Sequence, residues 1–190
     1  MKKRWKSILS LTLITFVLSI ILNLGSNSVL SYLPLALSIV LLFFIILVGV
    51  LFDILGVAAT AGEEAPFHAM ASNRVSGAKQ AIRLIRNADR VSTFCNDLIG
   101  DVAGTLSGAV GVAIVFQLGT ASMGLGETLV TTLMVALIAA LTVGGKSIGK
   151  GFAISKSTTI LLVAGKLIYS WEILLARLRP AEKKQKRSKA

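Results

Sequence analysis

The sequence has little of what soluble enzymes and metalloproteins commonly use. Its one cysteine, Cys95, excludes an internal disulfide and any thiolate cluster for zinc or iron–sulfur. Its one histidine, His68, has no second histidine or free thiolate for a soft-metal site, so we expect a polar interfacial role. No Ser-His-Asp set, glycine-rich phosphate loop or acid–base pair is found. We therefore predict no enzymatic activity, no catalytic residues and no cofactor-binding residues.

Basic residues are missing from residues 7–73 and 91–145, although each segment holds two apolar stretches long enough to cross a bilayer. All 20 Lys and Arg fall in four clusters, at residues 2–6, 74–90, 146–166 and 177–189. Basic residues stay on the cytoplasmic side of a membrane. Each of these two segments is therefore predicted to cross the membrane outward and to return as a helical hairpin. With 54% hydrophobic residues, the chain is predicted to be a multi-pass cell-membrane protein with cytoplasmic N- and C-termini.

The formal net charge of +11 would suggest nucleic acid as a partner of a soluble protein. Here the charge lies at the ends of apolar spans, where anionic lipid of the cytoplasmic leaflet is nearer. We expect the lipid bilayer and anionic lipids as partners, and no nucleic acid.

The predicted fold is all-α, with four transmembrane helices. They cover about residues 7–24, 31–60, 93–117 and 127–144. Residues 1–30 are interpreted as an N-terminal helix with an outside turn at Gly25–Ser28. Its apolar run is long for a signal peptide and no Ala-x-Ala-like site follows, so we predict that it is not cleaved.

Two amphipathic segments complete the predicted fold. Within the hydrophilic residues 61–92, apolar and basic side chains from residue 78 to 86 occupy separate helical faces, which predicts helices at the cytoplasmic surface. Residues 157–179 are predicted to form an interfacial juxtamembrane helix, because polar residues align on one face and a fifth crossing would place the basic tail outside. Residues 31–156 form the core, and residues 180–190 a disordered basic tail.

Ionisable residues inside membrane spans cost ~2.5–3.5 kcal/mol each at the helix centre, so they are functional candidates. Asp53 lies in the second span, with Thr60 two turns along the same face. Glu63 and Glu64 follow about one turn further on. Asn96, Asp97 and Asp101 lie in the cytoplasmic half of the third span.

Gly100, Gly104 and Gly108 are spaced by four and form one ridge, which lets a neighbouring helix approach closely. If the second and third spans pack antiparallel through this ridge, the acids converge. Oxygen ligands without histidine or thiolate suit a hard cation such as Mg²⁺. The simpler interpretation is that Glu63, Glu64 and Asp97 lie at the interface and balance nearby arginines.

The hydrophilic segment carries a pattern found in one transporter family. The matching stretches are Ala61-Gly62-Glu63-Glu64, Met70-Ala71-Ser72-Asn73-Arg74-Val75, Gly77-Ala78-Lys79-Gln80-Ala81-Ile82-Arg83-Leu84-Ile85 and Asn87-Ala88-Asp89-Arg90-Val91. Over about residues 40–175 the chain resembles the transmembrane domain of the cyclin M and CorB/CorC magnesium transporters. By this resemblance the first span is an addition to that domain, and we expect none of the family's nucleotide-binding CBS modules.

The resemblance implies Mg²⁺ as the bound or transported ion and a homodimer formed through the membrane domain. It places the family glutamate at Glu64 or, with a shift of one residue, at Glu63 with Thr60 as the serine. The family's Gly-Asn motif corresponds to Cys95-Asn96 or to Gly100-Asp101. With Asp53 added for its position inside the second span, the expected metal site comprises Glu64, Asn96, Asp101, Glu63, Asp53 and Thr60.

A later family motif, Gly-Glu-x-x-Pro-Lys, is occupied here by residues 145–150, where Lys146 and Gly149 replace the glutamate and the proline. Two functions are therefore considered. The first is transport or binding of a divalent cation in the membrane. The alternative is a non-transporting scaffold or partner subunit with a degenerate ion site.

Overall fold

A computed structural model describes residues 2–30, 32–118 and 125–178 of the chain. Within these ranges every regular element is a helix, which confirms the all-α prediction. The long elements are α1 (Lys2–Leu30), α2 (Leu35–Ala61), α6 (Asp101–Gln117), α7 (Leu125–Ser155) and α8 (Ser157–Leu178). The short ones are α3 (Ala65–Ser72), α4 (Ala78–Arg86), α5 (Ala88–Ser92) and the π-helix η1 (Thr93–Gly100), which leads into α6.

Five helical segments are long and apolar enough to cross a membrane: residues 9–26, 35–61, 88–117, 128–155 and 157–176. Large apolar side chains cover their outward faces, and Phe16, Phe43 and Leu133 are each more than half exposed. A soluble protein rarely exposes so much contiguous apolar surface, whereas lipid accepts it. The chain is therefore a multi-pass membrane protein by the criteria of length and composition.

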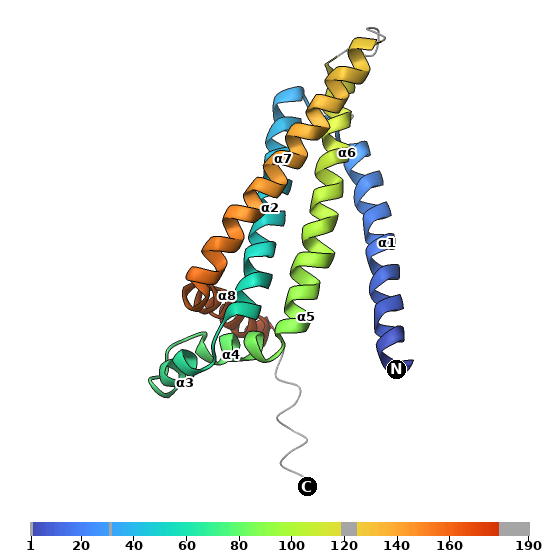
Figure 1. Cartoon of the computed structure of the whole chain (residues 1–190). Helices are drawn as coiled ribbons and strands as arrows, with labels where there is room; N and C mark the ends of the chain where they lie inside the picture. Colours follow the sequence, from blue (N-terminus) through green and yellow to red (C-terminus); the bar gives the residue numbers. More distant parts are fainter. Residues whose placement is uncertain (1, 31, 119–124, 179–190) are drawn as a thin grey trace.

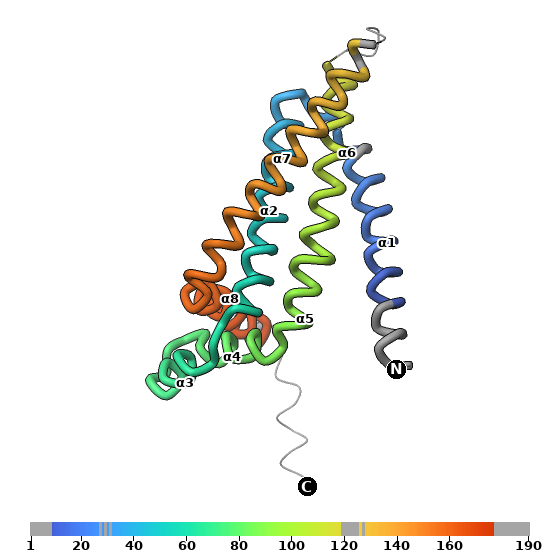
Figure 2. Tube along the Cα trace, in the orientation of Figure 1, coloured from blue at the N-terminus to red at the C-terminus, as the bar shows by residue number. Residues whose placement is uncertain are grey.

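The helices separate into a bundle and a cluster at one of its ends. In Figure 1, α1, α2, α6 and α7 extend away from the end where α3, α4, α5 and α8 gather. The trace in Figure 2 shows α1 leaning away from α6 towards its N-terminal end. Helix α2 contacts η1, α6 and α7, so it is the central helix of the bundle.

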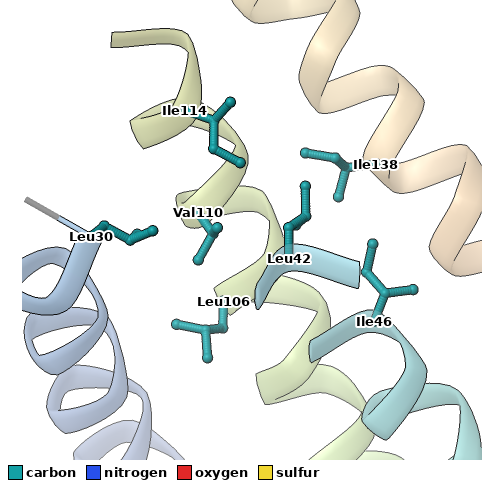
Figure 3. Close-up of a cluster of buried hydrophobic side chains, with 7 residues drawn as sticks. All are labelled: Leu30, Leu42, Ile46, Leu106, Val110, Ile114 and Ile138. Carbon is teal, nitrogen blue, oxygen red and sulfur yellow. The ribbon is translucent and has the colours of Figure 1, made fainter. Parts of the chain in front are cut away.

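The far end of the bundle is held by an apolar cluster drawn in Figure 3. Its members come from four helices: Leu30, Leu42, Ile46, Leu106, Val110, Ile114 and Ile138. A polar link lies beside it, because Gln117 Nε2 donates to the Leu30 carbonyl at 2.7 Å and Ser38 Oγ donates to Gln117 Oε1 at 3.3 Å. These bonds connect α1, α2 and α6 where the chain reverses.

The turn predicted at Gly25–Ser28 is wrong, because α1 continues through these residues to Leu30. Ser28 Oγ donates to the Leu24 carbonyl at 3.0 Å, so the hydroxyl is satisfied within the helix rather than by a turn. The chain reverses just before Pro34, which precedes the first residue of α2 and cannot donate a backbone hydrogen bond.

The glycine ridge does not pack as predicted. A Cβ placed on Gly104 or Gly108 meets no atom within 4 Å, so this part of the ridge has no neighbouring helix among the described residues. Helices α2 and α6 approach through Gly49 instead, where a Cβ would lie 2.9 Å from the Ala103 Cβ. Gly100 does lie at this contact, because a Cβ on Gly49 would lie 3.8 Å from the Gly100 carbonyl oxygen.

Helix α8 begins and ends within a residue of its predicted bounds and lies against α4. Gly77, which has φ +86°, directly contacts the backbone of Gly165 and Lys166. Phe67 and Leu161 are fully buried in an apolar cluster at the same end of the bundle. The cluster at this end is therefore a small packed unit and not a loose connection, and the tail at residues 180–190 lies outside the described residues.

Candidate functional site

Two oxygen atoms in the contact between α2 and η1 are buried without a hydrogen-bond partner. They are Asp53 Oδ2 and Asn96 Oδ1. Asp53 is only 4% exposed. The Asn96 amide nitrogen donates to Ser92 Oγ at 3.2 Å, which fixes the amide and leaves its oxygen as a free acceptor. An unsatisfied buried polar group costs about 1–3 kcal/mol, so this pair demands an explanation.

Each of these side chains lies over a glycine of the opposite helix. A Cβ on Gly56 of α2 would collide with the Asn96 carboxamide. A Cβ on Gly100 of η1 would lie 3.8 Å from Asp53 Oδ1. The oxygens therefore occupy space that larger residues at Gly56 and Gly100 would fill. We call the region around Asp53, Asn96, Gly56 and Gly100 the central contact.

Asn96 belongs to a π-helix, in which backbone hydrogen bonds skip five residues instead of four. The π-helix spans Thr93–Gly100, so it includes both Asn96 and Gly100. A π-turn widens the helix, and such turns are frequent at functional sites. The widening occurs where the buried oxygens face α2.

A cation from α7 lies beside the central contact. Lys146 Nζ is 3.5 Å from Asp101 Oδ1, and it is 3.3 Å from the position of a Gly100 Cβ. The space above Gly100 is thus shared by the Lys146 ammonium and the Asp53 carboxylate. The Lys146 side chain is 20% exposed and that of Asp101 is 71% exposed. Water therefore screens the Lys146 ammonium less than it screens the Asp101 carboxylate.

Glycines of α7 allow this approach. A Cβ on Gly145 would lie 3.0 Å from a Val50 methyl, and one on Gly149 would lie 2.8 Å from Ile54 Cγ1. These glycines lie close to Lys146 in sequence. Because they let α7 pack closely on α2, the Lys146 side chain can reach Gly100. The sequence identified Lys146 only as a replacement for a family glutamate. The signal that it reaches the acids is the glycine spacing of four around it.

Glu64 lies away from the central contact, in the cluster of short helices. It pairs with Arg86 at 3.0 Å and with His68 at 3.1 Å. The Arg86 hydrogen bond, more than the bond to His68, lowers the pKa of the Glu64 carboxyl below its usual value. This arrangement matches the simpler interpretation, in which the glutamate balances an interfacial arginine. His68 is exposed and polar, as expected.

The remaining candidates also stay outside the central contact. Thr60 Oγ1 donates to the Val57 carbonyl of its own helix at 2.9 Å. Glu63 is exposed just beyond the end of α2. The six predicted metal ligands thus form two groups. Asp53, Asn96 and Asp101 lie at or beside the central contact, whereas Thr60, Glu63 and Glu64 lie at or beyond the end of α2. Among the described residues, no group of three or more His, Cys, Asp and Glu side chains is arranged to hold a metal ion.

Comparison of the chain with protein-family models, with characterised proteins and with solved structures gave no match. Any functional conclusion therefore rests on the geometry of the helices and side chains.

Proposed function

We propose that this protein binds a divalent cation such as Mg²⁺ within the membrane and passes it across, with Asp53 and Asn96 as the protein ligands. The observation that carries this proposal is the pair of buried, unpartnered oxygens at the central contact. A carboxylate and an amide oxygen are ligands that a hard cation accepts.

Mg²⁺ keeps several waters and commonly uses only one or two carboxylates, so the donor set of the central contact fits it without a third acid. The glycines opposite the two side chains let both oxygens lie inside the contact between α2 and η1. Asp101 lies one turn beyond Asn96, and its exposed carboxylate is paired with Lys146, so it is not counted among the ligands. Glu64 has no direct part in this site, because Arg86 and His68 already occupy its carboxylate.

The proposed topology has four crossings, made by α1, α2, the continuous η1 and α6, and α7. Helix α8 is apolar enough to cross, yet it packs on α4 at the end of the bundle, which favours an interfacial position. Both termini are then cytoplasmic, in agreement with the basic clusters. The resemblance to the cyclin M and CorB/CorC membrane domain, the cell-membrane location and the homodimer belong to the same proposal.

Binding is tested by thermal unfolding of the purified protein in detergent with increasing MgCl₂. At tenfold excess over Kd, binding stabilises the folded state by about 1.4 kcal/mol, which raises Tm by a few degrees. Asp53→Asn and Asn96→Ala are expected to lose this gain. Glu64→Gln is the matched control and should keep it, because that carboxylate lies outside the central contact. A gain that persists in Asp53→Asn contradicts the proposed site.

Transport is tested in proteoliposomes that contain a fluorescent Mg²⁺ indicator. Wild-type protein should give a flux that Asp53→Asn abolishes and Glu64→Gln preserves. Choline chloride of equal ionic strength controls for non-specific salt effects.

The second candidate is a non-transporting scaffold or partner subunit. The observation that favours it is the Lys146–Asp101 contact, because an internal cation beside the acids reduces their attraction for a soluble one. Under this alternative, neither flux nor Mg²⁺-dependent stabilisation is expected in the wild type.

A further inference from the structure

A pocket of about 240 Å³ lies between the turn that joins α3 to α4 and the middle of α8. The residues that line it include Arg74, Ser76, Gly77, Lys79, Gln80 and Tyr169. We call it the basic pocket. It lies apart from the central contact, so a ligand bound in it would be independent of the proposed cation site.

The two cations of the basic pocket form no ion pair with the residues that the structure describes. The nearest carboxylate on α8, that of Glu172, is already satisfied. It accepts a hydrogen bond from Gln80 at 2.8 Å and pairs with Arg83 at 3.0 Å. Arg74 and Lys79 therefore keep an uncompensated positive charge beside the hydroxyl groups of Ser76 and Tyr169.

The backbone at Arg74 is strained in a way that glycine would relieve. Two backbone hydrogen bonds end helix α3. The Val75 amide donates to the Met70 carbonyl at 2.9 Å, and the Arg74 amide donates to the Ala71 carbonyl at 3.1 Å. This is the Schellman motif, whose left-handed position glycine usually occupies. Here Arg74 holds it with φ +57°. A side chain kept at a costly backbone position is consistent with a use for its guanidinium.

The opposite face of α8 indicates where the basic pocket lies relative to lipid. Gly165 and Glu172 face α4, as their contacts show. On the far side of the helix, Val163, Leu167 and Trp171 are 54%, 68% and 62% exposed. An amphipathic helix with such a face lies in the membrane interface, with its apolar side in the acyl layer. The basic pocket then lies at the level of lipid headgroups.

We propose that the basic pocket binds the phosphate group of an anionic phospholipid. Arg74 offers the planar donor pair that matches phosphate oxygens, and Lys79 adds a second positive charge. The Ser76 and Tyr169 hydroxyls are further donors, and tyrosine is favoured at the interface because its ring is apolar and its tip polar. Bound lipid would fasten α8 to the α3–α4 turn.

The experiment measures thermal unfolding of the purified full chain in a zwitterionic detergent, titrated with one of three probes. The probes are short-chain phosphatidic acid, short-chain phosphatidylcholine and inorganic phosphate at matched ionic strength. Phosphatidic acid is expected to raise Tm, with phosphatidylcholine giving little change. Inorganic phosphate acting as strongly as phosphatidic acid, and through Arg74, supports a phosphate site filled from solution. Equal shifts with the two lipids overturn the proposal.

Two variants test the pocket itself. Arg74→Gly removes the guanidinium but suits the left-handed backbone, so its Tm without lipid should be equal to or above that of the wild type. Its apparent affinity for phosphatidic acid should fall roughly tenfold, as for loss of a charge-assisted hydrogen bond. Lys79→Gln should fall by less. Lys150→Gln removes one exposed cation from α7 and should retain the wild-type response.

The variants decide between a site and general charge attraction. A lipid response unchanged in both Arg74→Gly and Lys79→Gln overturns the proposal. An equal loss in Lys150→Gln overturns it too, because net charge alone would then explain the effect. Because Arg74→Gly is expected to fold at least as well as the wild type, its loss of response is not attributable to misfolding.

Discussion

Acidic residues have opposite surroundings in the two halves of this molecule. At the central contact, Asp53 is buried between glycine-lined helices and one of its oxygens has no partner. In the cluster of helices at the end of the bundle, Glu64 and Glu172 lie at the surface, and each is paired with an arginine. The comparison shows that burial without a partner, and not acidity, distinguishes a candidate ion ligand from a structural charge.

The largest effect is expected when the central contact is overfilled. Gly56→Leu places a branched side chain where the Asn96 carboxamide lies, and should destabilise the fold by about 3 kcal/mol. Gly104→Leu is the matched control, since its Cβ meets nothing within 4 Å and we expect a change of less than about 0.5 kcal/mol. Thermal unfolding in detergent measures both. Equal losses would contradict the packing of Asn96 against Gly56.

The corresponding change in the cluster of short helices is Gly77→Ala. Its Cβ would lie 2.5 Å from the Lys166 backbone nitrogen, and φ +86° adds a left-handed penalty of about 1–2 kcal/mol. We expect α8 to detach from α4, so proteolysis between them should accelerate. Gly151→Ala, in open space on α7, should leave the cleavage rate unchanged. An unchanged rate in Gly77→Ala would show that this docking is not needed for protection.

Replacing Lys146 tests how its ammonium group affects cation binding at the central contact. Lys146→Met leaves Asp53 and Asp101 without the nearby ammonium, whose repulsion of a soluble cation at ~7 Å is about 2 kcal/mol per unit charge at an effective dielectric of ~20. After allowance for solvent screening, apparent Mg²⁺ affinity should rise about tenfold in the thermal titration. Lys150→Met, one turn along α7, should bind as the wild type does. A weaker Mg²⁺ affinity in Lys146→Met would contradict this prediction and would show that the lysine helps to hold the site together.

The smallest effect concerns Glu64, and it depends on pH. Because Arg86 lowers the folded-state pKa below the ordinary value of 4.5, the ionised form stabilises the fold above that value. This contribution is lost as pH falls from about 4.5 through the lower folded pKa. Glu64→Gln should therefore unfold at a slightly lower temperature than the wild type at pH 7. The difference should vanish in strong acid, and one that grows in acid would contradict the pairing.

The long helices follow from apolar runs that only a membrane or a large core accepts, and the bounds of α8 follow from its amphipathic pattern. The separation of the six predicted ligands into two groups could not be predicted from the sequence. Glu63 and Glu64 continue the helical spacing from Asp53 in sequence, yet α2 ends at Ala61 and the chain changes course. Helical spacing predicts a shared face only while the helix continues.

The sequence by itself determined that the chain is helical, multi-pass and basic at the ends of its spans, because these properties depend on local composition and charge. Tertiary structure decided which glycines bring helices together and which acids lose their partners. The reason is physical: close approach and burial depend on how α2, η1 and α7 rotate against one another. That rotation placed Lys146 beside Gly100 and left Gly104 facing outward.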